Sequence, residues 1–356
     1  MDVVRSQEAA AKLYFEQLGK VVGELKGKEV LIVITQIDPD AIGAAMGLKL
    51  LLNFVFGKRS SICYCGSIGH PQNRLIFAKY DLGREIIPIE KTQELFSSAD
   101  IAFVDSSNLK DPRIPKGVSF DPVIVIDHHQ NDGALKNSEG RFVWIESVGA
   151  ACTLVTELFR QSTTGMKLLQ EHPQVATLLA MGIYSDTKAL CAAGIRDGRA
   201  YSTIVELAST EDMNRLINYT FPESLARHLA AAVFNMKRAG PVVVTGVGLV
   251  TEDEADDVST VADFLMRMEG VTLVVSWAIV NDFVRISARS SDASRPLDKF
   301  MKAKFGNGAG AKVAPDGHGE GGARIDFPLG FWLTQRTLDN AVAVVAGRIE
   351  ELVFST

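Results

Sequence analysis

The sequence has few cysteines, no excess of basic residues and no long apolar run. Its four cysteines in 356 residues are too sparse for a disulfide scaffold, which indicates a reducing compartment, and we expect a cytoplasmic location. No stretch approaches the roughly 18 consecutive apolar residues of a membrane helix. The start, MDVVRSQEAA, is typical of a charged helix rather than a signal peptide. We therefore expect no membrane partner.

The charge balance limits the partners further. Lysine and arginine total 37 against 43 acidic residues, so the net charge is −6. A protein that binds long DNA or RNA needs a basic surface that releases counterions, so the balance excludes long duplex nucleic acid but allows a local basic pocket. With 47% hydrophobic and 22% charged residues, the composition is that of an ordinary globular chain. At about 150 residues per domain, two domains are expected.

Strand and helix patterns alternate in the first half of the chain. Apolar, β-branched runs predict strands at 29–35, 60–66, 84–89, 100–107 and 122–129. Helices are predicted at 5–26, 41–56, 92–98, 149–162 and 173–185. This alternation predicts a layered α/β domain over residues 1–195, built on a mostly parallel sheet.

The pattern changes in the second half. Residues 196–238 are helical throughout, as in a connector between domains. Strands are then predicted at 241–250, 272–281, 283–291 and 323–329, and helices at 260–270, 295–306 and 338–354. We expect a second, smaller α/β domain over 239–356. Its glycine-rich stretch, 306–322, is by itself typical of a flexible surface loop.

Acidic residues and histidines follow three strands of the first predicted sheet. They are Asp38 and Asp40 after the first strand, Asp105 at the end of 100–107, and Asp127, His128 and His129 at the end of 122–129; Asp186 ends a helix. In open parallel sheets, ligands bind outside the carboxyl ends of the strands. Several acids that converge there repel one another unless a cation neutralises them.

The residue types indicate which cation this is. Carboxylates with one or two imidazoles suit Mn²⁺ or Mg²⁺ better than a cysteine-rich zinc site would. One or two such ions can activate a water and clamp the phosphate that it attacks. The pattern therefore predicts hydrolysis at phosphorus.

Each motif also has a purely structural interpretation. Asp38 and Asp40 could be the N-cap and a first-turn acid of the helix 41–56. Asp105 could serve turn chemistry, and Cys63 and Cys65 are typical of small buried residues. Their joint occurrence at the ends of successive strands favours a metal site instead.

Taken in order, these motifs resemble the DHH phosphoesterases, RecJ-like, in the subgroup with a C-terminal DHHA1 domain. The segments that carry the resemblance are QIDPD at 36–40, Asp105, DHH at 127–129, ESVGAACTLVTEL at 146–158, GIYSDT ending at 187, VRISARSSD at 284–292 and DGHGEGGA at 316–323. The resemblance implies an N-terminal DHH domain with a parallel sheet and a smaller DHHA1-like α/β domain. It covers roughly residues 28–330.

The resemblance also implies roles for single residues. Metal ligands for one or two Mn²⁺ or Mg²⁺ ions would be Gln36, Asp38, Asp40, Asp105, His128 and Asp186. Asp105 would bridge two ions. Asp127 would orient His128 and fix its tautomer, and His129 would face the substrate phosphate. The catalytic set would thus be Asp105, Asp127, His128 and His129.

Further residues are expected to bind substrate. They are His129, Lys188, Ser287, Arg289, Gly317, His318, Gly321 and Gly322. Glycines let backbone N–H groups approach a phosphate, and arginine can hold a phosphate with two hydrogen bonds. Lys188 could equally be a solvated surface amine.

Gln36 stands where the resembled family has a metal-binding histidine. Because an amide oxygen is a weaker ligand, one metal site is expected to be weakened. The leading hypothesis is a phosphoesterase that hydrolyses short oligonucleotides, linear dinucleotides or 3′-phosphoadenosine-5′-phosphate through a metal-activated water. A catalytically weakened nucleotide-binding or sensor protein is the alternative, and a pyrophosphatase or exopolyphosphatase ranks lower. A homodimer is possible in each case.

Overall fold

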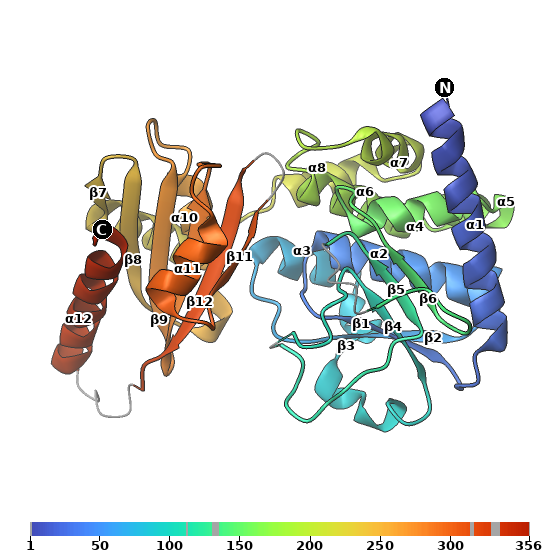
Figure 1. Cartoon of the computed structure of the whole chain (residues 1–356), viewed down its shortest axis with the longest axis horizontal. Coiled ribbons are helices and arrows are strands. Elements are labelled where there is room, and N and C mark those ends of the chain that lie inside the picture. The colour runs from blue at the N-terminus through green and yellow to red at the C-terminus, as the bar shows by residue number, and fades with distance from the viewer. Residues whose placement is uncertain (1, 112, 130–134, 314–316, 329–334, 356) are drawn as a thin grey trace. The chain divides into compact units, whose positions relative to one another are not determined.

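The computed structural model describes residues 2–111, 113–129, 135–313, 317–328 and 335–355 (Figure 1). The chain divides into two compact units. The N-terminal unit comprises Met1–Ile68 and Gln72–Tyr219, and the C-terminal unit comprises Gly69–Pro71 and Thr220–Thr356. The helices expected to form a connector over 196–238 are therefore shared between the two units.

A six-stranded sheet forms the centre of the N-terminal unit, with the order β3-β2-β1-β4-β5-β6. The strands are β1 (Val30–Ile34), β2 (Ser60–Tyr64), β3 (Ile86–Pro88), β4 (Asp100–Val104), β5 (Ile124–Asp127) and β6 (Phe142–Ile145). Each adjacent pair is parallel, and Val30 aligns with Ser60 on one side and Asp100 on the other. The predicted parallel sheet is confirmed. The sequence patterns did not predict β6, which has only four residues.

Both faces of this sheet are buried, which explains the continuous apolar run of β1. All five of its residues are buried. Ile32 and Ile34 pack into one hydrophobic cluster with helix residues, whereas Leu31 and Val33 pack into another with Phe103. Alternate side chains of a strand point to opposite faces, so a strand covered on both faces needs apolar residues at every position.

The α-helices pack on the face of Ile32 and Ile34, whereas 3₁₀ turns and loop residues cover the face of Leu31 and Val33. The helices are α1 (Asp2–Glu24), α2 (Pro39–Leu50), α3 (Pro71–Lys79), α4 (Ala151–Arg160), α5 (Thr163–Glu171), α6 (Pro173–Asp186), α7 (Ile195–Val205) and α8 (Thr210–Ile217). The helix predicted at 41–56 ends as an α-helix at Leu50 and continues as a π-turn, Leu51–Val55. The helix predicted at 92–98 is wrong, because only a 3₁₀ turn, Gln93–Leu95, forms there.

The C-terminal unit contains a second six-stranded sheet, with the order β11-β12-β10-β9-β8-β7. Its strands are β7 (Lys237–Ala239), β8 (Val242–Val250), β9 (Leu273–Val280), β10 (Phe283–Ser290), β11 (Gly310–Val313) and β12 (Gly319–Asp326). The sheet is mixed, because β8 and β9 run parallel and the other neighbours run antiparallel. The expected second α/β domain is confirmed.

Two pairs of helices cover this second sheet. They are α9 (Glu223–Asn235), α10 (Asp257–Leu265), α11 (Leu297–Phe305) and α12 (Gln335–Phe354). Residues of α11 and α12 pack with Val275 and Trp277, and residues of α9 and α10 pack with Val274 and Ala278. Because these strand residues alternate, the two helix pairs lie on opposite faces of the sheet.

Within the described residues of the glycine-rich stretch, part of the chain forms strands where its composition predicts a loop. The stretch contains β11 and the first residues of β12. A Cβ atom at Gly321 would lie 2.9 Å from Cγ of Met301 on α11, and one at Gly319 would lie 2.8 Å from Leu297. Glycine is therefore needed here because α11 packs directly against the strand.

Two smaller predictions concern cysteine and membranes. Cys63 and Cys65 are buried, and burial raises the pKa of both thiols to about 12, as expected for structural residues. Among the helices of the described ranges, none has both the length and the apolar character needed to cross a membrane.

Candidate metal centre

Three neighbouring strands deliver the acidic motifs to one edge of the N-terminal sheet. Asp38 and Asp40 follow β1, Asp105 follows β4, and Asp127 ends β5. The order of the sheet reverses between β1 and β4, since β1 leads to β2 on one side and β4 leads to β5 on the other. Such a switch point opens a crevice at the carboxyl ends of the strands, where ligands bind.

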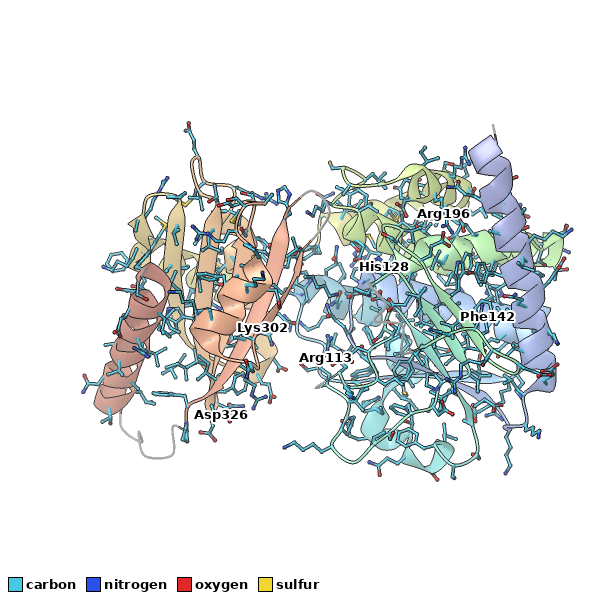
Figure 2. All side chains as sticks on the ribbon, in the orientation of Figure 1. Arg113, His128, Phe142, Arg196, Lys302 and Asp326 are labelled. Atoms are coloured by element: carbon cyan, nitrogen blue, oxygen red, sulfur yellow. The ribbon has the colours of Figure 1, made fainter. Side chains whose placement is uncertain are left out.

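The imidazole of His128 lies at the centre of the acidic side chains. Its Nε2 atom is 3.2 Å from Oδ1 of Asp105, 3.5 Å from Oδ2 of Asp186 and 3.7 Å from Oδ2 of Asp40. We call these four residues, Asp40, Asp105, His128 and Asp186, the acidic cluster. The side chains of Asp40 and Asp105 are buried, whereas that of Asp186 is 30% exposed. Residues up to 146 positions apart in the chain thus meet around His128, which Figure 2 labels in the N-terminal unit.

The tautomer of His128 follows from its second ring nitrogen. Nδ1 lies 3.2 Å from the carbonyl oxygen of Val148, which can only accept a hydrogen bond. Nδ1 therefore carries the hydrogen, and in the neutral ring Nε2 presents its lone pair to the carboxylates.

The cluster has the donor set and the unmet bonding of a cation site. Within the described residues, Nε2 of His128 and Oδ1 of Asp105 are buried without an aligned hydrogen bond. Buried polar atoms in this state need an explanation, and an ion between them supplies one. Two groups of ligand atoms lie within 4.8 Å of one another, Asp40 with His128 and Asp186, and Asp105 with His128 and His129. Carboxylate oxygen and imidazole nitrogen fit Mn²⁺ or Mg²⁺.

Asp40 is fixed by the first turn of α4. The backbone N–H groups of Ala151 and Cys152 donate to its two carboxylate oxygens at 2.6 and 2.8 Å. The positive end of the α4 dipole therefore faces this buried charge. Gly182 on α6 makes the approach possible, because a Cβ atom there would lie 2.4 Å from Sγ of Cys152 and 2.9 Å from Cα of Asp40.

Asp38 has the capping role that its position suggested as an alternative. Its Oδ1 accepts a hydrogen bond from the N–H of Ala41, so it is the N-cap of α2. Asp40, by contrast, bonds to α4 and is not simply a first-turn acid. The negative charge of Asp38 still acts on the cluster, since it contributes to the raised pKa of Asp186.

Asp127 orients a different histidine from the one expected. Its Oδ1 accepts from Nδ1 of His129 at 2.7 Å and from the backbone N–H of His128 at 2.8 Å. The ring of His128 is oriented by Val148 instead. The difference arises because His129 turns its ring back toward the end of β5. Burial opposes ionisation of Asp127, but its bonds to His129 outweigh burial and lower its pKa.

The mutual repulsion of the acids is visible in their pKa values. Burial, together with the charge of Asp105, raises the pKa of Asp40 to about 6. Partial burial and the charges of Asp40 and Asp38 raise the pKa of Asp186 well above its usual value. Burial opposes protonation of His128, but the surrounding carboxylates, Asp105 first, raise its pKa to about 10. The protein alone therefore retains a proton where a divalent ion can replace it.

Left-handed backbone marks two turns of the site. Asp105 has φ of 55° directly after β4, and Lys188, Ala189 and Leu190 have φ of 52°, 57° and 67° directly after α6. Such conformations cost roughly 1–2 kcal/mol for residues other than glycine. They occur at functional sites where the surrounding structure holds them in place. Lys188 itself is exposed, two residues after Asp186.

The expected substrate-binding residues of the C-terminal unit form a second group. Ser287 and Arg289 lie on β10, and Gly321 and Gly322 lie on the neighbouring β12, where Ser287 aligns with Gly322. Gly317 and His318 directly precede β12. The guanidinium of Arg289 is paired with Asp263, with Nε to Oδ1 at 2.5 Å and Nη2 to Oδ2 at 3.2 Å.

Sequence reasoning missed two supports of the site. Asp197 accepts from the N–H of Gly149 at 2.9 Å and from Oγ1 of Thr153 at 2.6 Å, which fixes the segment that carries Val148. Arg113 donates from Nη1 to Oε1 of Gln36 at 2.6 Å. Both residues lie far in sequence from the motifs that they contact, so no local pattern marks them.

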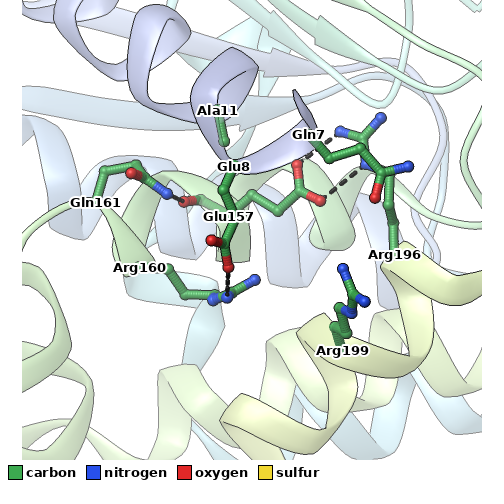
Figure 3. A pocket seen from close by; sticks show the side chains of 8 residues that line it. All are labelled: Gln7, Glu8, Ala11, Glu157, Arg160, Gln161, Arg196 and Arg199. Atoms are coloured by element: carbon green, nitrogen blue, oxygen red, sulfur yellow. Dashed lines mark hydrogen bonds and ion pairs between the residues drawn. The ribbon is translucent and has the colours of Figure 1, made fainter. Parts of the chain in front are cut away.

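A small pocket also lies outside this site (Figure 3). It is lined by residues of α1, α4 and α7, and four of its charged side chains form two ion pairs. Arg196 donates two hydrogen bonds to Glu157 at 2.8 and 2.6 Å, and Arg160 donates to Glu8 at 2.9 Å. None of the acidic-cluster residues lines it.

A known family model matches part of the N-terminal unit. Residues 29–183 match the model of the DHH family, N-terminal domain. The match covers most of the N-terminal unit but less than half of the chain. Over this region, which includes Asp40, Asp105 and His128, the chain is similar to the DHH family.

Two curated relatives are similar to parts of the chain. The chain is 30% identical over 314 residues to "Uncharacterized protein MJ1633" of Methanocaldococcus jannaschii, an alignment that covers 87% of this chain and 60% of that protein. It is 37% identical over 107 residues to the A-adding tRNA nucleotidyltransferase of Aquifex aeolicus, across 29% of this chain and 12% of that protein. The chain thus spans about three fifths of the first relative and a small part of the second.

A solved structure shares the fold of nearly the whole chain. An exopolyphosphatase-related protein from Bacteroides fragilis superimposes with a TM-score of 0.67 at 16% sequence identity. The superposition covers 96% of this chain and 98% of that one. Likeness at this level of identity establishes a common fold.

Proposed function

We propose that this protein is a metal-dependent phosphoesterase that hydrolyses small nucleotide substrates. The observation that carries the proposal is the acidic cluster within a DHH-family domain, where buried carboxylate and imidazole atoms converge without aligned hydrogen bonds among themselves. Without an ion, the three carboxylates of the cluster repel one another or must bind protons, which destabilises the fold. A divalent ion turns the same arrangement into a binding site.

One or two Mn²⁺ or Mg²⁺ ions fit the residues present. Asp40, Asp105, His128 and Asp186 would hold an ion, which when bound supplies Lewis acidity toward a phosphate and its attacking water. The protein prepares these ligands in advance. Backbone N–H groups of α4 fix Asp40, and the carbonyl of Val148 fixes the ring of His128. Fixed ligands lose little entropy when they bind.

The chain's other polar groups then act on the substrate. In the proposed hydrolysis, water supplies the oxygen that bonds to phosphorus, the P–O ester bond breaks, and the leaving oxygen takes a proton. We assign His129 to the substrate phosphate, because its ring is fixed by Asp127 and Nδ1 lies 3.7 Å from Oδ1 of Asp105. Lys188, next to the end of α6, is the expected counter-charge for the phosphate chain.

The substrate class follows from charge and from the C-terminal unit. The net charge of −6 disfavours long nucleic acid. The two strands with Ser287, Arg289, Gly321 and Gly322 offer a guanidinium and side-chain-free backbone, which suit a nucleotide phosphate. We therefore propose short oligonucleotides, linear dinucleotides or 3′-phosphoadenosine-5′-phosphate as substrates.

A substrate panel tests the proposal. It comprises linear dinucleotides, 3′-phosphoadenosine-5′-phosphate, a short RNA, pyrophosphate and polyphosphate, each with Mn²⁺ and with Mg²⁺. We expect release of mononucleotide or phosphate from at least one nucleotide substrate. Asp105→Asn should lower this turnover by at least about 100-fold, since even residues that only orient metal ligands are worth 10–100-fold.

Glu94→Gln is the matched control, because it removes one exposed carboxylate away from the acidic cluster. Its turnover should equal that of the wild type. Turnover of pyrophosphate or polyphosphate alone would contradict the nucleotide assignment. Tight nucleotide binding without any turnover at high protein concentration would favour a binding or sensor protein instead. The observation that motivates this alternative is Gln36, whose side-chain oxygen accepts a hydrogen bond from Arg113.

A further inference from the structure

An arginine occupies the first motif of the site. Nη1 of Arg113 donates to Oε1 of Gln36 at 2.6 Å. The same guanidinium donates from Nε and Nη2 to the two carboxylate oxygens of Asp111 at 2.8 and 2.7 Å. The backbone N–H of Arg113 also donates to Asp111, at 2.9 Å. The three side-chain bonds fix the guanidinium, although 40% of the side chain is exposed.

This arrangement conflicts with a metal ion at Gln36. An amide offers one oxygen to a metal, and here that oxygen accepts a hydrogen bond from a cation. A guanidinium does not lose its proton in proteins, so its charge stays in place. A divalent ion at the same oxygen would lie within a few Å of this charge, where repulsion is strong because water is partly excluded.

Asp38 has positive partners without an ion. Its Oδ1 accepts from the first turn of α2, whose dipole is positive there. Its charge also raises the pKa of Arg113, as does the closer carboxylate of Asp111, so the two side chains lie within electrostatic reach of one another. Neither of the metal-capable groups found among the described residues includes Asp38.

Both of those groups contain His128, which limits the number of ions. One group joins His128 to Asp40 and Asp186, and the other joins it to Asp105 and His129. Nδ1 of His128 is committed to Val148, so a single lone pair, on Nε2, serves both groups. Because both groups share this one nitrogen atom, they describe the surroundings of a single ion.

We propose that the centre holds a single divalent ion in the acidic cluster, and that the guanidinium of Arg113 supplies the second positive charge and binds the substrate phosphate. This inference rests on the proposed function and specifies its site. Arg113 has five N–H donors, of which three point to Asp111 and Gln36. The remaining N–H groups on Nη1 and Nη2 suit two phosphate oxygens.

The number of ions is measured with manganese alone. The full chain is titrated with Mn²⁺ by calorimetry, and the bound metal is examined by electron paramagnetic resonance. We expect one Mn²⁺ per chain with the spectrum of a magnetically isolated ion. The double variant Gln36→His/Arg113→Ala should bind a second ion and show a spin-coupled spectrum. Two coupled ions in the wild type, or none, overturn the proposal.

The role toward phosphate is measured with inorganic phosphate on the manganese-loaded protein. Arg113→Ala should weaken phosphate binding by about tenfold or more, since hydrogen bonds to charged groups contribute roughly 1.5–3 kcal/mol. Arg113→Lys should recover part of the affinity, because lysine keeps the charge but not the paired donors. Arg59→Ala is the control, because that side chain is 81% exposed. Equal phosphate affinity in Arg113→Ala and wild type overturns this role.

The two proposals fail in different ways. One bound Mn²⁺ and Arg113-dependent phosphate binding without turnover of any substrate would contradict the phosphoesterase function alone. Turnover of a nucleotide with two coupled Mn²⁺ ions would contradict the single-ion site alone.

Discussion

The two sheets of this protein handle their charged residues differently. In the N-terminal unit, Asp105 and His128 leave buried atoms without aligned hydrogen bonds among the described residues. In the C-terminal unit, Arg289 pairs with Asp263, and His228 pairs with Asp257 at 2.7 Å. A parallel sheet sends every carboxyl end to the same edge, so acids accumulate there. The pairs in the C-terminal unit join α10 to β10 and to α9, so each acid there lies opposite a basic side chain.

This difference indicates which unit needs a ligand to be complete. The acidic cluster sets three carboxylates against the single imidazole of His128, and an added cation relieves both their repulsion and the unmet bonding. The C-terminal group is already neutralised, so a ligand there must compete with existing ion pairs. We therefore expect the metal to affect the N-terminal unit strongly and the C-terminal unit little.

The largest effect is expected from closing the space between α6 and Asp40. Gly182→Ala should lower the free energy of unfolding by about 3 kcal/mol, at the upper end for overpacked sites, because its Cβ would clash with Cys152 and Asp40. Chemical denaturation of the full chain measures this change. Gly198→Ala on α7 is the control, since a Cβ there meets nothing within 4 Å and alanine should stabilise the helix. Equal stability of both variants would contradict the tight packing at Asp40.

Manganese itself should stabilise the two units unequally. At a concentration of 100 times Kd, a ligand of the folded state adds about 2.7 kcal/mol to the stability of the unit that binds it. Hydrogen exchange with mass spectrometry should show this protection in peptides of α2, α4 and α6. Peptides of β9 and β10 serve as the internal reference. Equal protection of both sets would contradict a binding site confined to the N-terminal unit.

The affinity for Mn²⁺ should decrease as the pH is lowered. Between about pH 6 and pH 10, binding must displace the proton of His128, whose pKa is raised to about 10. Below the pKa of Asp40, raised to about 6, a second proton must leave as well. As the pH is lowered from about 10 to 6, the apparent affinity should therefore decrease about tenfold per pH unit, and below pH 6 it should decrease more steeply. Titration in buffers of different ionisation enthalpy counts the protons, and an affinity independent of pH from 5 to 8 would contradict the cluster as the site.

The smallest effect is expected in the C-terminal unit. Arg289→Ala should raise KM roughly fivefold and leave kcat unchanged, because a charged hydrogen bond shared with Asp263 contributes only uniform binding. Asp263→Asn provides the opposite change, since it releases Arg289 for substrate and should lower KM. Steady-state kinetics distinguish the two. A loss of kcat alone in Arg289→Ala would indicate a different role.

Local sequence patterns were sufficient for much of this architecture. The β-branched runs predicted five of the six N-terminal strands, because a strand covered on both faces must be apolar throughout. Of the acids after those strands, Asp40 and Asp105 meet at His128 as predicted, whereas Asp38 caps α2. Short or irregular elements escaped prediction. β6 has four residues, and the glycines concealed β11 and the first residues of β12, which pack closely against α11.

The partners of each site residue could not be predicted in the same way. Asp127 binds His129 instead of orienting His128, and Arg113 contacts Gln36 across 77 positions. Such contacts depend on how loops fold back over the sheet edge. Their sequence separation is arbitrary, and several nearby partners of equal chemistry compete for each bond.

The sequence by itself determined the α/β layering, the carboxylates and histidines available for a divalent ion, and the acidic net charge, since each follows from local periodicity or composition. Only the tertiary structure decided the tautomer of His128, the burial that raises the pKa of Asp40, and the arginine that engages Gln36. The reason is physical: hydrogen-bond partners and dielectric surroundings are properties of assembled neighbours, and no residue carries them along the chain.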